Sequence, residues 1–203
     1  VPKIPLGPFT TDISIYKKSP ATGLRITWVG HSSLLIEIDG RRILTDPVWS
    51  ERASFLSFMG PKRFFAPPLR LDQLPPLDGI IVSHDHYDHL DKETIKFFAG
   101  KNINFYCSRG NKQYLEKWGI NTSFITEMDW GDSVMVGGDI VVTAAPARHF
   151  SGRGIFNRNT TLWSSFVIKG PKHNIFFGAD SGWFPGFKEV GDTFGPFDLT
   201  MLE

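Results

Sequence analysis

Short apolar runs separated by turn residues are the main pattern along this chain. The turn Asp39-Gly40 lies between two such runs and is a strong hairpin signal. Residues 79–83, Gly-Ile-Ile-Val-Ser, form a short apolar run that is typical of a strand buried on both faces. The strands predicted in this way are residues 25–29, 34–38, 41–45, 79–83, 103–108, 139–145, 162–169 and 174–178.

Two helices are predicted between these strands. Residues 91–98 form the first, which Asp91 caps and Gly100 closes; residues 111–118 form the second, which Gly119 stops. Strands that meet helices at such intervals indicate sheets covered by helices, in layers.

Composition indicates a folded domain and disfavours nucleic acid as a partner. Hydrophobic residues make up 41% of the 203 residues and charged residues 21%, which excludes an intrinsically disordered chain. The net charge of +1 provides no electrostatic attraction to nucleic acid. The single cysteine, Cys107, cannot form an internal disulfide and is expected to be buried in a strand. Because no internal repeat or linker divides the chain, residues 1–203 are interpreted as one domain.

The ends and the apolar runs bear on location. No stretch reaches the ~18–20 apolar residues that a membrane-spanning helix needs. Residues 1–8 contain no signal-peptide core and no initiator methionine, so we expect a trimmed or processed chain. The expected location is cytoplasmic or membrane-associated, with any upstream anchor outside this sequence.

Three histidines and two aspartates precede the first predicted helix within six residues. They directly follow the buried strand 79–83, and the carboxyl ends of such strands are where ligand sites collect in α/β proteins. Imidazole and carboxylate together suit zinc, and alternate residues can face two different ions. The sequence therefore predicts a metal site in the segment His84-Asp85-His86-Tyr87-Asp88-His89.

Four further polar residues follow apolar strands in the same manner. His31 and Asp46 follow strands in the first part of the chain, and His149 and Asp180 follow strands in the second part. Each alone is read most simply as a loop residue. Because the same end of several strands carries them, we expect them to join the metal site.

Residues 83–91, Ser-His-Asp-His-Tyr-Asp-His-Leu-Asp, resemble the HxHxDH signature of the metallo-β-lactamase superfamily. Nearly the whole chain is similar to the branch of N-acyl-phosphatidylethanolamine-hydrolysing phospholipase D and its bacterial relatives. This similarity is carried by residues 28–31, 44–47, 59–64, 74–78, 129–130, 180–182 and 195–199. The resemblance implies an α/β (α+β) fold, a four-layer αββα sandwich with a dinuclear zinc site at one edge.

The resemblance also implies a role for each candidate residue. The first zinc would be bound by His84, His86 and His149. The second would be bound by Asp88 and His89, and Asp180 would bridge the two ions. Asp46 would support the ligands from behind, and His31 would either do the same or line the pocket, whereas His173 is expected on the surface.

The ligand types favour hydrolysis. Diiron relatives of this superfamily carry Glu at the position of His86, so zinc hydrolysis is preferred here over redox chemistry. A metal-bound hydroxide would attack a phosphodiester, with Asp88 and Asp180 holding it in line. The leading hypothesis is a zinc-dependent phosphodiesterase acting on a lipid such as N-acyl-phosphatidylethanolamine. The alternatives are a lactonase or other carboxylic-ester hydrolase, a non-catalytic metal-binding domain and, least favoured, a nuclease.

Two sets of residues are candidates for substrate contact. A phosphate could be held by an arginine among Arg148, Arg153 and Arg158, although each is also explained as a solvated loop charge. The long loop at residues 48–76 is rich in Pro, Phe and Arg. Six of its side chains either line an apolar entrance for a lipid, with peripheral membrane contact, or pack onto the sandwich: Phe55, Leu56, Phe58, Met59, Phe64 and Phe65. Oligomeric state is not predicted.

The C-terminal part of the sequence leads to a further expectation. In the resembled superfamily the second zinc takes another histidine from beyond the bridging aspartate, and here no histidine follows His173. Residues 197–203 form an apolar run that resembles the beginning of a strand, and an unfinished strand edge invites aggregation. We therefore expect a fragment of a longer protein, with a second zinc site that is incomplete unless another chain supplies a ligand.

Overall fold

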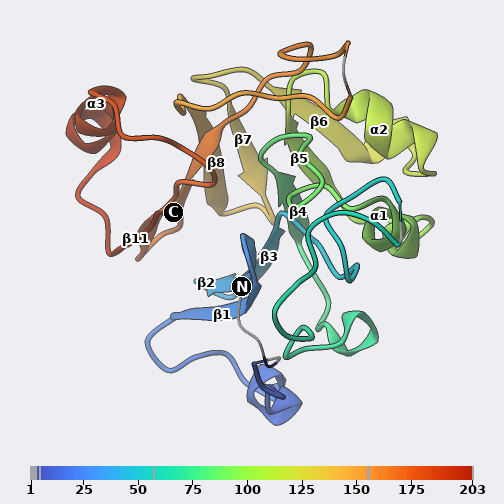
Figure 1. Cartoon of the computed structure of the whole chain (residues 1–203). Coiled ribbons are helices and arrows are strands. Elements are labelled where there is room, and N and C mark those ends of the chain that lie inside the picture. Colours follow the sequence, from blue (N-terminus) through green and yellow to red (C-terminus); the bar gives the residue numbers. More distant parts are fainter. Residues whose placement is uncertain (1–3, 5, 57, 155, 203) are drawn as a thin grey trace.

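The computed structural model describes residues 4, 6–56, 58–154 and 156–202 and contains two β-sheets packed face to face (Figure 1). The first sheet has the order β1-β2-β3-β4-β5-β6. Neighbours are antiparallel from β1 to β3 and parallel from β3 to β6. Its strands are β1 Leu24–Gly30, β2 Ser33–Ile38, β3 Arg41–Thr45, β4 Gly79–Val82, β5 Phe105–Ser108 and β6 Ile125–Met128.

The second sheet has the order β11-β10-β9-β8-β7. Its neighbours are antiparallel except β10 and β11, which run parallel. Its strands are β7 Ser133–Val136, β8 Ile140–Ala145, β9 Ser165–Lys169, β10 Asn174–Phe177 and β11 Leu199–Met201. The strand expected at the C-terminal end of the chain is therefore present as β11.

Apolar side chains from facing strands fill the space between the sheets. Ile36 and Ile81 of the first sheet belong to the same buried cluster as Val142 and Phe166 of the second. Successive residues of a strand point to opposite faces, so Ile80, next to Ile81, belongs to a different cluster on the outer face. The apolar run at residues 79–83 is thus buried on both faces, as its composition predicts.

Helices cover the outer faces of both sheets. The helices α1 Lys92–Phe98 and α2 Lys112–Lys117 pack on the first sheet, where Ile95 and Leu115 join the outer-face cluster. The helix α3 Gly186–Phe194 packs on the second sheet through Val190 (Figure 1). The order helix, sheet, sheet, helix confirms the four-layer αββα sandwich. Short 3₁₀ helices are formed before β1 by Ile13–Lys17 and in the connections by Leu71–Gln73 and Thr122–Phe124.

Local signals located most elements but not all. The hairpin turn at Asp39-Gly40 is present, with both residues at positive φ, 48° and 87°. The strands β6 and β7 and the helix α3 were not predicted from the sequence. Three of the four residues of β7 are exposed or only partly buried, so it has no clear apolar pattern. The helix α3 contains two glycines, which weaken its helix signal.

Asp91 stands at the N-cap position of α1, as predicted, but its side chain does not cap the helix. Its carboxylate accepts no hydrogen bond from the N–H groups of the first helical turn. It accepts hydrogen bonds from the backbone N–H of Ser50, at 3.0 Å, and from the hydroxyl groups of Ser50 and Thr94. Donors of Ser50 and Thr94 occupy the carboxylate instead, so Asp91 ties the loop after β3 to α1.

Two other expectations concern burial and the membrane. Cys107 is fully buried on β5, as expected. Within the described residues, no helix combines the length and the apolar character that crossing a membrane requires.

Candidate metal centre

Loops that leave both sheets at one edge carry the candidate residues. Asp46 directly follows β3 and Ser83 directly follows β4, and these strands are parallel, so their carboxyl ends meet. His31 lies in the turn between β1 and β2, beside the end of β3. His149 follows β8 and Asp180 follows β10, which bring the second sheet to the same place.

Four of the predicted ligands form one group. The Nε2 of His84 lies 2.9 Å from the Nδ1 of His86, and the Nε2 of His149 lies 3.2 Å from the same atom. One carboxylate oxygen of Asp180, Oδ2, lies 3.6 Å from the Nε2 of His149. The potential ligand atoms of these four residues all lie within 4.8 Å of one another.

A second group lies on the other side of Asp180. Its other oxygen, Oδ1, lies 2.9 Å from the Nε2 of His89. The Nε2 of His31 lies 3.2 Å from the same nitrogen of His89 and 3.1 Å from Oδ2 of Asp88. Asp180 therefore contacts both groups, which is the placement expected of a bridging carboxylate.

Asp46 orients the rings from behind, together with Ser83. Its carboxylate accepts hydrogen bonds from the Nδ1 of His89, at 2.7 Å, and from the backbone N–H and hydroxyl of Ser83, at 2.7 and 2.6 Å. Because the Ser83 hydroxyl donates its proton to Asp46, it accepts from the Nδ1 of His84 at 2.9 Å. Both rings thus direct Nε2 towards the centre. Ser83 was not among the predicted site residues. Its position between the buried strand and the first histidine of the motif could have indicated such a role.

The first group consists of neutral rings. Burial lowers the pKa of the His84 imidazole well below its usual value, and the nearby charges of His89 and His86 lower it further. Burial also lowers the pKa of His86 and of His149. These three rings are therefore neutral at pH 7, which is the form that binds a metal.

The second group is charged in the absence of a cation. Burial opposes protonation of His89, but its hydrogen bonds to Asp180 and Asp46 prevail and raise the pKa of the ring to about 10. Burial alone would raise the pKa of Asp88, whereas the hydrogen bond with His31 and the nearby histidine charges lower it overall. That same bond to Asp88 raises the pKa of His31.

The two groups fit zinc. Imidazole nitrogens and carboxylate oxygens are its usual ligands in proteins, and zinc sites favour about four of them. The first group offers three nitrogens and one carboxylate, and the second offers two nitrogens around the shared Asp180.

Asp85, the second residue of the motif, and Arg153, one of the candidate arginines, hold the motif loop in place. Asp85 is fully buried and accepts from the backbone N–H of Gly152, at 2.7 Å, and from the Tyr114 hydroxyl, at 3.2 Å. The guanidinium of Arg153 donates to the carbonyls of Asp85 and Leu90, at 2.6 and 2.7 Å. Arg153 therefore braces the motif loop, and its guanidinium is already engaged with backbone oxygens.

The other two candidate arginines are exposed. Arg148 donates to the carbonyl of Trp183 at 3.0 Å, and the guanidinium of Arg158 lies 5.3 Å from the centre of the Phe150 ring. His173 is partly buried, unlike the surface position expected, because its Nδ1 bonds Asp39 at 2.7 Å. It precedes β10, at the end opposite Asp180.

Among the described residues, several cavities adjoin the site, and two of them include a residue of the motif loop in their lining. One of about 340 Å³ is lined by His31 and Asp88 of the second group and by Trp28, Arg63 and Phe65, among others. Another of about 760 Å³ lies beside Tyr87 of the motif and extends over the loop after β3.

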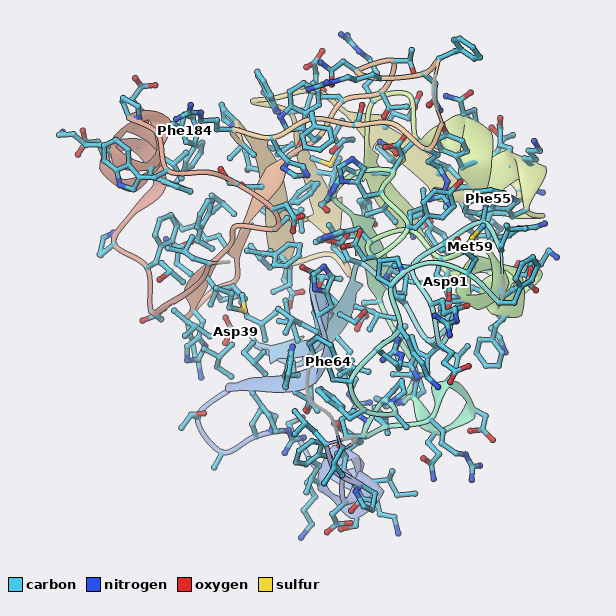
Figure 2. The ribbon with its side chains drawn as sticks, viewed as in Figure 1. Asp39, Phe55, Met59, Phe64, Asp91 and Phe184 are labelled. Carbon is cyan, nitrogen blue, oxygen red and sulfur yellow. The ribbon has the colours of Figure 1, made fainter. Side chains whose placement is uncertain are left out.

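Four of the six loop side chains considered for lipid entry are exposed. Phe55 and Phe58 have 74% and 75% of their surface open, and Met59 and Phe64 have 54% and 48%. Figure 2 shows Phe55 and Met59 towards the rim on the side of α1 and α2, with Phe64 nearer to β1. Packing onto the sandwich therefore does not account for these four.

Comparison with known proteins agrees with this geometry. A model described as a β-lactamase superfamily domain matches residues 41–203. The chain belongs to the β-lactamase superfamily. The resemblance noted in the sequence is thereby confirmed at the level of the superfamily.

Relatives within the superfamily include hydrolases of different kinds. An N-acyl-phosphatidylethanolamine-hydrolysing phospholipase D of Caenorhabditis elegans is 40% identical, over 89% of this chain and 53% of the relative. A UPF0173 metal-dependent hydrolase of Caldivirga maquilingensis is 30% identical, over 87% of this chain and 68% of the relative. The chain spans about half the length of several curated relatives that it matches, the nematode enzyme included.

A solved structure shares the fold. It is the isothiocyanate hydrolase from Delia radicum gut bacteria, with a TM-score of 0.65 and 17% identity, over 84% of this chain and 68% of the other. At that identity the likeness establishes the sandwich and no particular substrate.

Proposed function

We propose that this chain carries the zinc centre of a hydrolase that cleaves phosphodiesters of the N-acyl-phosphatidylethanolamine type. The observation that carries the proposal is the convergence of two groups of ligands on Asp180, whose two oxygens contact His149 in one group and His89 in the other. Two metal ions a few ångströms apart are the usual arrangement for phosphoester hydrolysis. The similarity to the nematode phospholipase D supports the same class of substrate.

Zinc at this centre would supply a water that loses its proton near pH ~7, together with positive charge for the phosphoryl oxygens. The chain supplies orientation. Asp180 contacts both groups, and Asp88 lies 3.1 Å from the His31 Nε2, so in this proposal their carboxylates hold the attacking water in line by accepting its hydrogen bonds. The oxygen of water would add to phosphorus and the bond from phosphorus to the head-group oxygen would break. The proton given up by the water would pass to that oxygen, so that the head group leaves as an alcohol.

The cavity beside His31 and Asp88 suits a lipid phosphodiester. Its wall includes the apolar rings of Trp28 and Phe65, and Arg63 lies among its lining residues. The Arg63 guanidinium donates to the carbonyls of Ser50 and Val48, and no carboxylate pairs with it among the residues described. An anionic group in this cavity would therefore meet a guanidinium that forms no direct ion pair among the described residues, next to apolar walls.

The exposed side chains of the loop after β3 support contact with a lipid surface. Phe55 and Phe58 project beside the larger cavity, which also contains Lys92 and Lys117. Glu51 and Glu93 line the same cavity, so the charges around these apolar side chains are mixed. Exposed apolar side chains with lysines nearby suit the boundary between acyl chains and head groups. We propose that this loop touches the membrane while the substrate enters the site.

Parallel assays test the proposed reaction. The zinc-loaded chain is offered N-acyl-phosphatidylethanolamine in mixed micelles, bis(p-nitrophenyl) phosphate and a simple lactone, beside the His86→Ala variant. We expect cleavage of both phosphodiesters, formation of phosphatidic acid from the lipid and turnover ~10³-fold lower in the variant. Turnover of the lactone alone would instead assign a carboxylic-ester hydrolase, and zinc binding without any turnover would assign a non-catalytic metal-binding domain.

A further inference from the structure

The carbonyl of Ser83, directly before the first histidine of the motif, is held from both sheets. The hydroxyl of Ser108, the last residue of β5, donates to it at 2.6 Å. The backbone N–H of Ser164, directly before β9, donates to the same oxygen at 3.2 Å. Because β5 belongs to the first sheet and β9 to the second, one carbonyl oxygen joins both sheets next to the first group of ligands.

A pair of buried hydroxyls supplies the shorter of these bonds. The hydroxyl oxygens of Ser108 and Ser164 lie 2.8 Å apart. A carbonyl oxygen can only accept, so the single proton of the Ser108 hydroxyl goes to Ser83, and the Ser164 hydroxyl donates to Ser108. All three serines are at most 1% exposed. Loss of a hydroxyl here would therefore leave the carbonyl short of a donor where bulk water has little access.

The position of Ser108 at the end of the ladder explains why a side chain makes this bond. The strands β4 and β5 pair in parallel up to Val82 and Cys107 (Figure 1). The strand β4 ends at Val82, and one residue later the hydroxyl of Ser108 takes the place of a backbone donor. The peptide at which the motif loop leaves the sheet is thus fixed by side chains rather than by the ladder.

The direction of the Ser83 peptide bears on His84. The held carbonyl belongs to the planar unit that links Ser83 to His84, whereas the Ser83 N–H that reaches Asp46 belongs to the preceding unit. The Ser83 hydroxyl accepts from the Nδ1 of His84. That bond keeps the proton of the neutral ring on Nδ1 and leaves the lone pair of Nε2 for a cation.

We propose that Ser108 and Ser164 are positioning residues of the first metal site. They hold the peptide between Ser83 and His84 and thereby keep the His84 ring in the tautomer that binds a metal. The hydroxyl of Ser164 acts through Ser108, so it has the smaller effect. The assignment rests on the metal centre of the proposed function and concerns the first group of its ligands.

A purely structural role of the two serines predicts a different outcome. Loss of a buried hydrogen bond would then destabilise the whole chain and weaken both zinc sites alike. The hydroxyls of Ser133 and Thr143 provide a matched control, because they form another such pair, 2.7 Å apart, between β7 and β8. Among the residues described, neither of these two hydroxyls bonds to a candidate ligand.

Zinc competition titrations of the 203-residue chain compare Ser108→Ala, Ser164→Ala and the control Ser133→Ala. Imidazole NMR signals assign each binding step to a group. Direct outer partners of a ligand contribute ~10–100-fold to affinity, and Ser108 acts one contact further out, so its loss should weaken the first zinc about three- to tenfold and the second less than about twofold. Ser164→Ala should show a smaller loss in the same direction, and Ser133→Ala none. Equal losses at both sites, or a first-site affinity in Ser108→Ala that equals the parent's, would overturn the proposal.

Nitrogen NMR of the imidazoles provides a readout that global destabilisation would not change. In the metal-free parent at pH ~8, the neutral His84 ring should carry its proton on Nδ1 alone, because Ser83 accepts that proton. In Ser108→Ala, and to a smaller extent in Ser164→Ala, a fraction of the rings should carry the proton on Nε2. A ring that stays entirely in the Nδ1–H form in both variants would overturn the proposal. If Ser108→Ala fails to fold, Ser164→Ala provides both readouts.

Failure of the inference is distinguishable from failure of the proposed function. If the parent binds zinc and the variants show these effects, but no ester is cleaved, the assignment of Ser108 and Ser164 stands and the proposed reaction fails. If the parent cleaves phosphodiesters and both serine variants match it in both readouts, the proposed reaction stands and this inference fails.

Discussion

The two groups of ligands that share Asp180 differ in the protonation of their histidines when no metal is bound. In the first, burial keeps the rings of His84, His86 and His149 neutral. In the second, His89 holds a proton between two carboxylates, and its pKa is about 10. One group is ready for a cation, whereas the other is stabilised by its own charge pairs and must lose a proton. We therefore expect the first site to fill before the second, and the two to respond differently to pH.

The largest expected effect comes from removing one ligand of the first group. The His86→Ala variant should lose most of the first-site zinc, and phosphodiester cleavage should fall ~10³-fold, because a metal supplies several kcal/mol of charge stabilisation. Zinc content by atomic emission and turnover of bis(p-nitrophenyl) phosphate measure both effects. An unchanged zinc content would remove His86 from the assignment.

The next effect distinguishes the two groups through Asp46. The Asp46→Asn variant loses a carboxylate oxygen that accepts from the Nδ1 of His89 directly and reaches His84 only through Ser83. Zinc affinity should fall ~10–100-fold, and more at the second site than at the first.

A matched control exists at the far end of β10. The Asp39→Asn variant breaks another Asp–His pair with the same 2.7 Å separation, that of Asp39 with His173. It should leave both zinc affinities unchanged. Equal losses in the two variants would mean that Asp46 acts on overall folding rather than on the ligands.

The pH dependence is a smaller effect and follows from the sign of each shift. Because the pKa of His89 is raised to about 10, the second zinc must displace a proton at pH 7, so its affinity should rise ~tenfold per pH unit up to about pH 10. The first-site rings have lowered pKa values, so their affinity should be level above pH ~6.5. Calorimetry in buffers of different ionisation enthalpy counts the released protons. Equal proton release at both sites would contradict the comparison.

The same shifts affect the stability of the chain without zinc. A raised His89 pKa contributes stability that is fully present below the unfolded value of ~6.5 and is lost as pH rises through about 10. The lowered pKa of His84 contributes stability that is present above ~6.5 and is lost as pH falls. Urea unfolding of chelator-treated protein from pH 5 to pH 10 should therefore show falling stability at both extremes. Replacing His89 by Gln should remove the alkaline decline.

The smallest expected effect on the metal centre comes from the exposed loop after β3, whose replacement should leave the zinc affinities of both sites unchanged. In the double variant Phe55→Ser and Phe58→Ser, both zinc affinities should match the parent, because neither side chain belongs to a ligand group. Binding to vesicles of phosphatidylcholine and phosphatidylserine should weaken about tenfold or more, since each buried Phe contributes ~1.5–3 kcal/mol. Unchanged cosedimentation with vesicles would remove the loop from the proposed membrane contact.

Features encoded within a few residues could be predicted from the sequence, and this includes much of the centre. The motif at residues 84–89 and the placement of His149 and Asp180 after strands follow from local pattern and from the rule that strand ends meet. The hairpin at Asp39-Gly40 is local in the same way.

Features that depend on tertiary packing could not be predicted. His31 meets His89 across 58 positions of sequence, and Arg153 meets Asp85 across 68, so no local pattern reports either contact. The strand β7 and the helix α3 form because the second sheet offers them a partner, and their own sequences carry weak signals.

Anomalous diffraction at the zinc edge, from crystals of the zinc-loaded chain, tests the central claim most directly. Two peaks are expected on either side of Asp180, one contacted by His84, His86 and His149 and the other by Asp88 and His89. A single peak at full zinc occupancy, or a second peak that His89 does not contact, would contradict the proposed dinuclear centre.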